Sequence, residues 1–158
     1  MTRKTTDWLW KAAVAGFCGS VAHTPLMYLK SRIGLLPAFQ PYASFQAALS
    51  HMIGGQVHPI VPWALSFLNG ATILGFAFGR LYELLPGRSG MVKGLMFGVA
   101  GWLAIGLLFF PLIGLGPFAA RLGLGVEPAL FSLAMILTYS LVLGAVYGAL
   151  HARATPPT

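Results

Sequence analysis

The sequence predicts an all-α integral membrane protein, a four-helix bundle that forms a single transmembrane domain over residues 1–158. Of its 158 residues, 57% are hydrophobic and only 8% are charged, whereas a soluble domain usually has ~25% charged residues. The stretch from Gly94 to Gly116 carries no charged side chain, and about 20 apolar residues span the hydrocarbon core of a bilayer. Small residues recur every four positions in each apolar stretch, a spacing that lets helix backbones approach closely in lipid.

The first span is expected over residues 9–29. It follows a basic N-terminal segment, and Gly16 and Gly19 belong to two interleaved stripes of small residues. Pro25 removes one helical hydrogen bond and is expected to bend the second half of the span. A signal peptide is the rival interpretation, because a basic start precedes an apolar run. We favour a span that stays in the protein.

The connection over residues 30–59 is the longest one. Proline interrupts it early and Gly54-Gly55 loosens it late. Between these breaks, residues 42–53 have apolar side chains on one face and predict a short helix lying along the membrane surface. A partly disordered loop is the alternative.

The second, third and fourth spans are expected over residues 60–83, 92–113 and 128–150. Prolines at the start of the second and fourth spans suit a first helical turn. Small-residue stripes place several glycines at contacts between helices. These glycines are Gly75, Gly79, Gly94, Gly98, Gly101, Gly144 and Gly148.

The two halves of the chain resemble each other. A shift of 82 residues aligns the first span with the third, pairing Gly16 with Gly98, and a shift of 69 aligns the second with the fourth, pairing Gly75 with Gly144. This pattern predicts two repeated helical hairpins related by an axis along the membrane normal. Similar composition of glycine-rich spans is the simpler alternative.

Basic residues predict the orientation, because cytoplasmic segments carry an excess of Lys and Arg. Seven of the ten basic residues fall in the N-terminal segment, the second turn and the C-terminal tail. The other three are Lys30, Arg32 and Arg121. We therefore expect both termini in the cytoplasm. The same topology explains the net charge of +7 better than nucleic-acid binding, because the basic residues form no clustered face.

Several motifs combine glycine, proline and aromatic residues in a recognisable order. They are Leu35-Leu36-Pro37, Leu84-Leu85-Pro86-Gly87, the run from Lys93 to Leu103, the run from Pro111 to Gly116, and the run from Leu143 to Gly148. Over about residues 12–150 they resemble a family of small four-span bacterial membrane proteins known only as a domain of unknown function. The resemblance supports the fold, and we expect the protein in the bacterial cytoplasmic (inner) membrane. It implies no activity and no cofactor.

Four polar side chains are the candidate functional residues. His23 lies well inside the first span, where an ionisable residue is by default a functional hypothesis; a neutral histidine bonded to a neighbouring helix or to an interfacial water is the simpler interpretation. Asn69 lies within the second span and can form hydrogen bonds between helices. Arg80 and Glu83 are three positions apart and are expected to pair at the end of that span; a docking site for a partner is the alternative.

The sequence predicts no catalytic, cofactor-binding or metal-ligating residue, and we expect no enzyme. Only Asp7, Glu83 and Glu127 are acidic, and no nucleophile, phosphate-loop or zinc-protease motif occurs. The leading hypothesis is an accessory or assembly subunit of a larger membrane complex, in contact with the lipid bilayer and with other membrane subunits or further copies of itself. The alternative is a small oligomeric transporter or channel for a neutral or apolar solute. That alternative requires the polar side chains of the spans to converge on one cavity. They are His23, Thr24, Ser66, Asn69, Thr72, Thr138 and Ser140.

Overall fold

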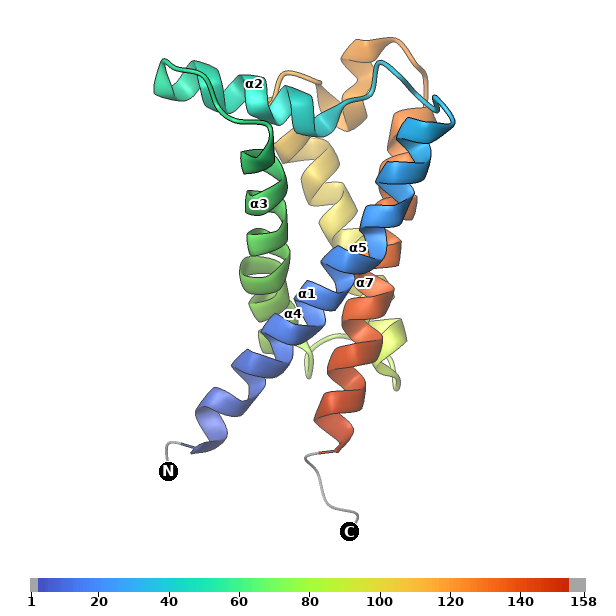
Figure 1. The fold of residues 1–158 in the computed structure, drawn as a ribbon. Helices are drawn as coiled ribbons and strands as arrows, with labels where there is room; N and C mark the ends of the chain where they lie inside the picture. The colour runs from blue at the N-terminus through green and yellow to red at the C-terminus, as the bar shows by residue number, and fades with distance from the viewer. Residues whose placement is uncertain (1–2, 154–158) are drawn as a thin grey trace.

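The computed structural model describes residues 3–153, with side chains from Asp7 onward. It confirms the predicted all-α fold and places four helices, each long and apolar enough to cross a membrane, where the sequence predicts them. Their bounds are Asp7–Arg32, Ile60–Leu81, Gly90–Leu112 and Glu127–Ala152. Figure 1 shows these helices as a bundle with a further helix lying across one of its ends.

The first helix, α1 (Arg3–Arg32), is longer than predicted at both ends. No glycine or proline precedes its apolar part, so the helix continues through the polar N-terminal residues, and Lys11 donates a hydrogen bond to the Asp7 carboxylate one turn away. It also runs through Pro25. It stops before Gly34, whose φ of +66° suits the end of a helix.

The second and third spans each contain a widened π-helical turn that the sequence pattern does not predict. The second span consists of α3 (Ile60–Asn69), the π segment η1 (Gly70–Leu74) and α4 (Gly75–Leu81). The third consists of α5 (Gly90–Ala104), the π segment η2 (Ile105–Phe109) and α6 (Phe110–Leu112). Such turns are rare in helices and often occur at functional sites. The fourth span is a single helix, α7 (Glu127–Ala152).

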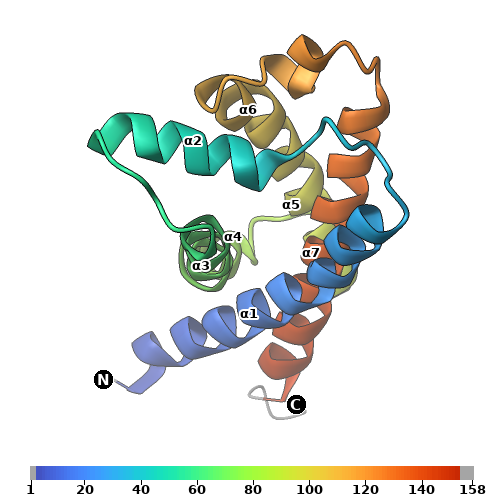
Figure 2. The same ribbon diagram turned by 45° about the horizontal axis from the view of Figure 1, so that its top comes forward.

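Helix α2 (Pro41–Ile53) lies across one end of the bundle and confirms the helix predicted over residues 42–53. Figures 1 and 2 show it perpendicular to α3, above the ends of the spans. Its first turn is anchored by the Tyr42 ring, which stacks on Trp63 with centroids 4.1 Å apart. Gly54, with a φ of +67°, ends it. We call this end of the bundle the α2 end.

The short 3₁₀ helix η3 (Pro117–Leu122) also lies at the α2 end and is not predicted by the sequence pattern. Phe118 and Ala119 have φ values of +49° and +62°, which are uncommon for residues with a side chain. The Phe118 ring lies directly against Gly106 of η2, where a larger residue would collide with it. Packing of this ring therefore accounts for a backbone conformation that local sequence does not favour.

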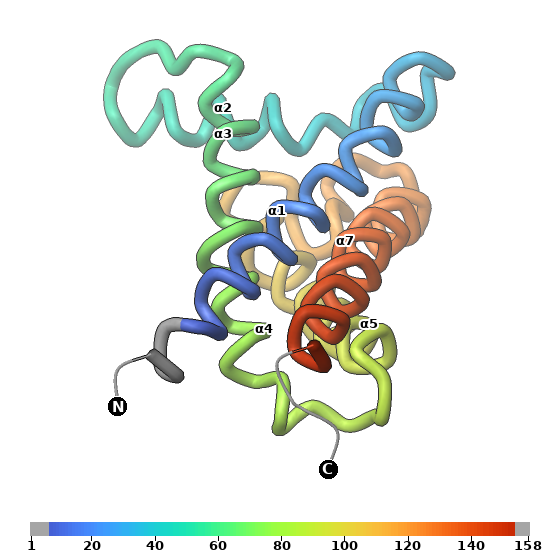
Figure 3. The backbone as a smooth tube through the Cα atoms, turned by 60° about the horizontal axis from the view of Figure 1, so that its bottom comes forward, coloured from blue at the N-terminus to red at the C-terminus, as the bar shows by residue number. Residues whose placement is uncertain are grey.

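The first turn of α1 and the last turn of α7 lie at the opposite end of the bundle, which we call the termini end. Figure 3 views the molecule from this side and shows the turn between α4 and α5 at the same level as the N- and C-terminal ends of α1 and α7. An aromatic cluster closes this end: Phe78 and Tyr82 pack on Tyr147, with ring centroids 5.6 and 4.8 Å apart. A second cluster, centred on Phe39 and Phe110, closes the α2 end.

Candidate functional site

Glycines build two close helix crossings, as predicted. At the first, Gly16 of α1 lies against the backbone of Gly70 and Ala71, and Gly75 lies against the carbonyl oxygen of Ala12. At the second, Gly144 of α7 lies against the backbone of α5. In both places the nearest atoms are backbone, so a side chain could be accommodated only by separating the helices.

The other predicted packing glycines have different kinds of neighbour. Gly94, Gly98 and Gly148 belong to the α5–α7 crossing, Gly19 lies against Tyr139, and Gly79 lies against Trp8 and Tyr147. Gly90 and Gly106 also lie against neighbouring elements, and the sequence analysis did not single them out.

The prediction that Gly101 packs between helices is wrong for this chain. A Cβ there would have no atom within 4 Å. The reason is its neighbour: the Trp102 indole spans from α5 to α7 and donates hydrogen bonds to Ala129 O and Ser132 Oγ at 3.1 and 3.2 Å. The Trp102 indole therefore occupies the space between α5 and α7 at the level of Gly101, so the two helices are farther apart there than at their glycine crossing.

His23 is half-buried in the bundle and contacts its own helix. Its Nδ1 is 3.4 Å from the carbonyl oxygen of Gly19, and because a carbonyl can only accept, that nitrogen is the donor. The imidazole meets the Tyr139 ring edge to face, with centroids 6.3 Å apart. The hydrogen-bond partner is thus a carbonyl of the same helix, and neither a neighbouring helix nor an interfacial water is needed to satisfy this nitrogen.

Tyr139, which the sequence analysis did not single out, links two spans at this level. Its hydroxyl donates a hydrogen bond of 2.7 Å to the carbonyl oxygen of Gly70, the first residue of the π segment η1. Tyr147, two turns further along α7, makes a longer contact of 3.5 Å with Gly79 O. The spacing of eight residues between the two tyrosines is the signal that could have revealed a shared face.

Asn69 is exposed on the surface of the second span. It directly precedes η1, and its side chain makes no capping hydrogen bond. No hydrogen bond joins it to any other described side chain. Thr72 on the same face behaves differently, because its hydroxyl donates to Leu68 O of its own helix at 2.6 Å. Asn69 is therefore an amide in the middle of a span without a partner among residues 7–153.

The predicted pair between Arg80 and Glu83 is wrong. Helix α4 ends at Leu81, and no ion pair joins Arg80 to Glu83 among the described residues. Glu83 instead lies 3.3 Å from His151 Nε2 at the end of α7, a contact that is ionic when the histidine is protonated. Arg80 is exposed and joins no ion pair with the described residues.

The polar side chains required for a transport path do not converge within one chain. Thr24 and Thr138 donate to carbonyl oxygens of their own helices, at 2.9 and 2.8 Å. Ser66 meets the Tyr42 hydroxyl at 3.2 Å, and Ser140 is buried against Gly98. Most of these groups are thus satisfied locally rather than directed into a shared space.

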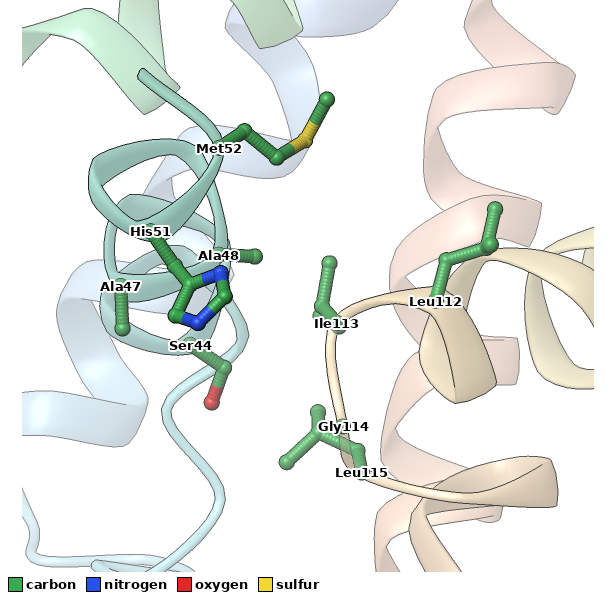
Figure 4. Close-up of a pocket in the computed structure, with 9 residues that line it drawn as sticks. All are labelled: Ser44, Ala47, Ala48, His51, Met52, Leu112, Ile113, Gly114 and Leu115. Carbon is green, nitrogen blue, oxygen red and sulfur yellow. The ribbon is translucent and has the colours of Figure 1, made fainter. Parts of the chain in front are cut away.

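Two cavities open at the α2 end. One, of about 490 Å³, lies between α2 and the loop after α6. Figure 4 shows His51 and Met52 on one wall and Ile113 and Leu115 on the other. The second, of about 440 Å³, lies between the last turns of α1 and the first turns of α2 and α3. Only Thr24 of the expected transport path lines either cavity.

Within the part of the chain that the structure describes, no three His, Cys, Asp or Glu side chains lie together as a metal site would require.

Near the α2 end, burial raises the pKa of the Tyr42 hydroxyl, partly offset by its contact with Ser66. That hydroxyl is therefore neutral and available as a hydrogen-bond donor.

These features define a class: a small multi-pass α-helical membrane protein whose spans cross at glycines and whose polar groups are mostly satisfied within their own helices. Residues 7–158 match the family of unknown function DUF6789, and the chain belongs to that family. No curated protein and no solved structure matches.

Proposed function

We propose that the protein is a non-catalytic accessory or assembly subunit that binds another membrane protein within the bilayer. The observation that carries the proposal is Asn69, exposed in the middle of a span with no partner among the described residues. Leu65 and Ile73 are exposed one turn to either side. This strip of the second span, Leu65–Asn69–Ile73, is the proposed contact surface.

The energetics favour a protein partner over lipid at this surface. Acyl chains offer no hydrogen-bond partner to an amide, and an interhelical hydrogen bond contributes about 0.6–2 kcal/mol in membranes. A helix that presents an amide, hydroxyl or carbonyl opposite Asn69 would satisfy it. The adjoining π segment favours the same conclusion, since such segments are frequent at functional sites.

The experiment is gentle extraction from native membranes followed by native mass spectrometry of the complexes. We expect the wild-type chain in a larger complex of fixed stoichiometry, and Asn69→Leu released from it. Thr72→Val is the matched control, because it removes a polar group from the same face that is already satisfied by Leu68 O. A wild-type chain that stays monomeric in mild detergent would refute the proposal, and a homo-oligomer lost on Asn69→Leu would identify a second copy as the partner.

The transporter alternative has less support. It needs a polar path, and the side chains that could form one do not line a common cavity within a single chain. An oligomer could still form a path at its centre. Reconstituted vesicles that gain permeability to a neutral solute only with the protein present would favour this alternative.

We further propose that the two hairpins are an internal repeat. The contacts support this, because they correspond under the two sequence shifts. Ala12 meets Gly75 in the first hairpin, and Gly94 meets Gly144 in the second. Equivalent positions also meet each other. Gly70 and Tyr139 are related by the shift of 69 residues, and the Tyr139 hydroxyl donates a hydrogen bond to the Gly70 carbonyl oxygen. Contacts between equivalent positions are expected near a two-fold axis.

For location we propose the bacterial cytoplasmic membrane, with the termini end in the cytoplasm. Lys11, Arg80, Arg88, Lys93 and Arg153 lie at or near this end, against Lys30, Arg32 and Arg121 at the other. An excess of basic residues on one side is the usual mark of the cytoplasmic side.

A further inference from the structure

Three lysines are buried or half-buried in the bundle, and one of them differs from the others. Lys11 pairs with the Asp7 carboxylate, and Lys93 donates a hydrogen bond of 2.7 Å to Tyr82 O. Lys30, with only 3% of its surface exposed, has neither a carboxylate nor a hydrogen-bond acceptor among residues 7–153. Its ammonium lies 5.8 Å from the centroid of the Phe39 ring, near the outer limit of a cation–π interaction at about 6 Å.

The Lys30 side chain lines the cavity of about 440 Å³ at the α2 end. We call this the Lys30 cavity. Thr24 and Lys30 of α1, Gln40 and Tyr42 at the start of α2, and Trp63 of α3 contribute to its walls. No acidic residue lines it. Lys30 therefore brings an unpaired positive charge to the wall of this cavity, which has both the space and the charge for an anion.

The surroundings of the cavity suit a lipid. Tyr28, Ala43 and Pro59 of its lining are exposed, whereas Met27 and Lys30 are buried. Arg32 lies beside the rim, with its guanidinium 5.5 Å from the Tyr28 ring, and adds a second positive charge. The cavity also lies where α1 ends and α3 begins, which is the level of the headgroups for helices that span the bilayer.

Further residues of α1 lie on the same face of the helix as the cavity lining and continue toward the middle of the span. Phe17, Val21, Thr24 and Tyr28 follow one another at helical spacing along α1, and Phe17 and Val21 are exposed. They form a mostly apolar strip that leads from the cavity toward the middle of the span; its one hydroxyl outside an aromatic ring, on Thr24, donates to Ser20 O of the same helix. We propose that the Lys30 cavity binds the phosphate of an anionic phospholipid, with the acyl chains lying along this strip.

The test uses delipidated protein in detergent, titrated with phosphatidylglycerol and observed by native mass spectrometry. We expect Lys30→Gln to weaken retention of the lipid by at least about tenfold, since charge-assisted hydrogen bonds to phosphate are roughly twice as strong as neutral ones. Arg121→Gln is the matched control, because it removes a positive charge from the α2 end outside the cavity and should leave retention unchanged. Equal retention by wild type and Lys30→Gln would overturn the proposal.

A second arm separates a lipid from a free anion. Millimolar inorganic phosphate should not displace phosphatidylglycerol from the wild-type protein; displacement would mean that the cavity is a site for a soluble anion and would overturn the lipid assignment.

Thermal unfolding gives a further readout. Phosphatidylglycerol should raise the Tm of the wild type and not that of Lys30→Gln. Without lipid, Lys30→Gln should be at least as stable as the wild type, because it removes an uncompensated charge. A lower Tm for the lipid-free variant would show that Lys30 serves the fold itself and would contradict the proposal.

Discussion

Replacement of Gly144 by alanine should destabilise the bundle, and the structure allows the size of the effect to be bracketed. A Cβ at Gly144 would overlap the carbonyl oxygen of Gly90 and lie 2.9 Å from the Cα of Gly94. Both neighbours are backbone atoms, which cannot move aside as a side chain does. The two helices must therefore separate, and over-packing of this kind typically costs about 1–3 kcal/mol.

Gly101→Ala is the matched control, because it lies on the same helix pair and adds the same methyl group. The added Cβ would have no other atom within 4 Å, and alanine favours a helix over glycine by up to about 1 kcal/mol. We expect Gly101→Ala to leave stability unchanged or raise it. Gly148→Ala should fall between the two, because its closest neighbours would be 3.1 Å away.

The assay is reversible unfolding of the purified protein in mixed micelles, followed by circular dichroism. Gly144→Leu, and likewise Gly98→Leu, should go further and prevent the folded bundle from accumulating. Equal stability of Gly144→Ala and Gly101→Ala would refute the argument that the α5–α7 crossing depends on direct backbone contact.

Three further predictions follow from single contacts. Tyr139→Phe should lower stability by about 0.6–2 kcal/mol through loss of the hydrogen bond to Gly70 O, and Tyr147→Phe should cost less because its contact is 3.5 Å long; equal losses in the unfolding assay would contradict this ranking. Glu83→Gln should change stability by less than about 1 kcal/mol, because its contact with His151 is exposed; a larger loss in the same assay would show that the pair is structural. In a Cys18→Ala background, an impermeant maleimide should label Gly55→Cys from outside intact cells and Ser89→Cys only after lysis; the reverse pattern would invert the proposed topology.

The helices were predictable because their causes are local. An uncharged stretch long enough to span lipid can satisfy its backbone only as a helix or a closed barrel, and the small-residue stripes correctly indicated helices and most of their contacts. The bounds of α2 were set by Pro41 and Gly54, whose backbone preferences act whatever the surroundings.

The errors concern contacts that depend on distant parts of the chain. Gly101 belongs to a correct stripe, yet Trp102 holds the helices apart at that level. Glu83 was expected to meet Arg80, but it lies against His151, which comes from the far end of the sequence. The left-handed backbone of Phe118 depends on the space that Gly106 leaves for its ring. The spacing of residues along the chain and their helix propensities do not predict contacts of this kind, because the partners are far apart in the sequence.

The two proposed surfaces lie in different places and can be separated by experiment. Asn69 is in the middle of the second span, whereas the Lys30 cavity is at the α2 end. If they act independently, Asn69→Leu should release the partner and retain phosphatidylglycerol, and Lys30→Gln should do the opposite. Release of the partner by Lys30→Gln as well would mean that a bound lipid forms part of the contact. Trp63 makes such coupling physically reasonable, because it lines the cavity from α3 itself, less than two helical turns before Asn69.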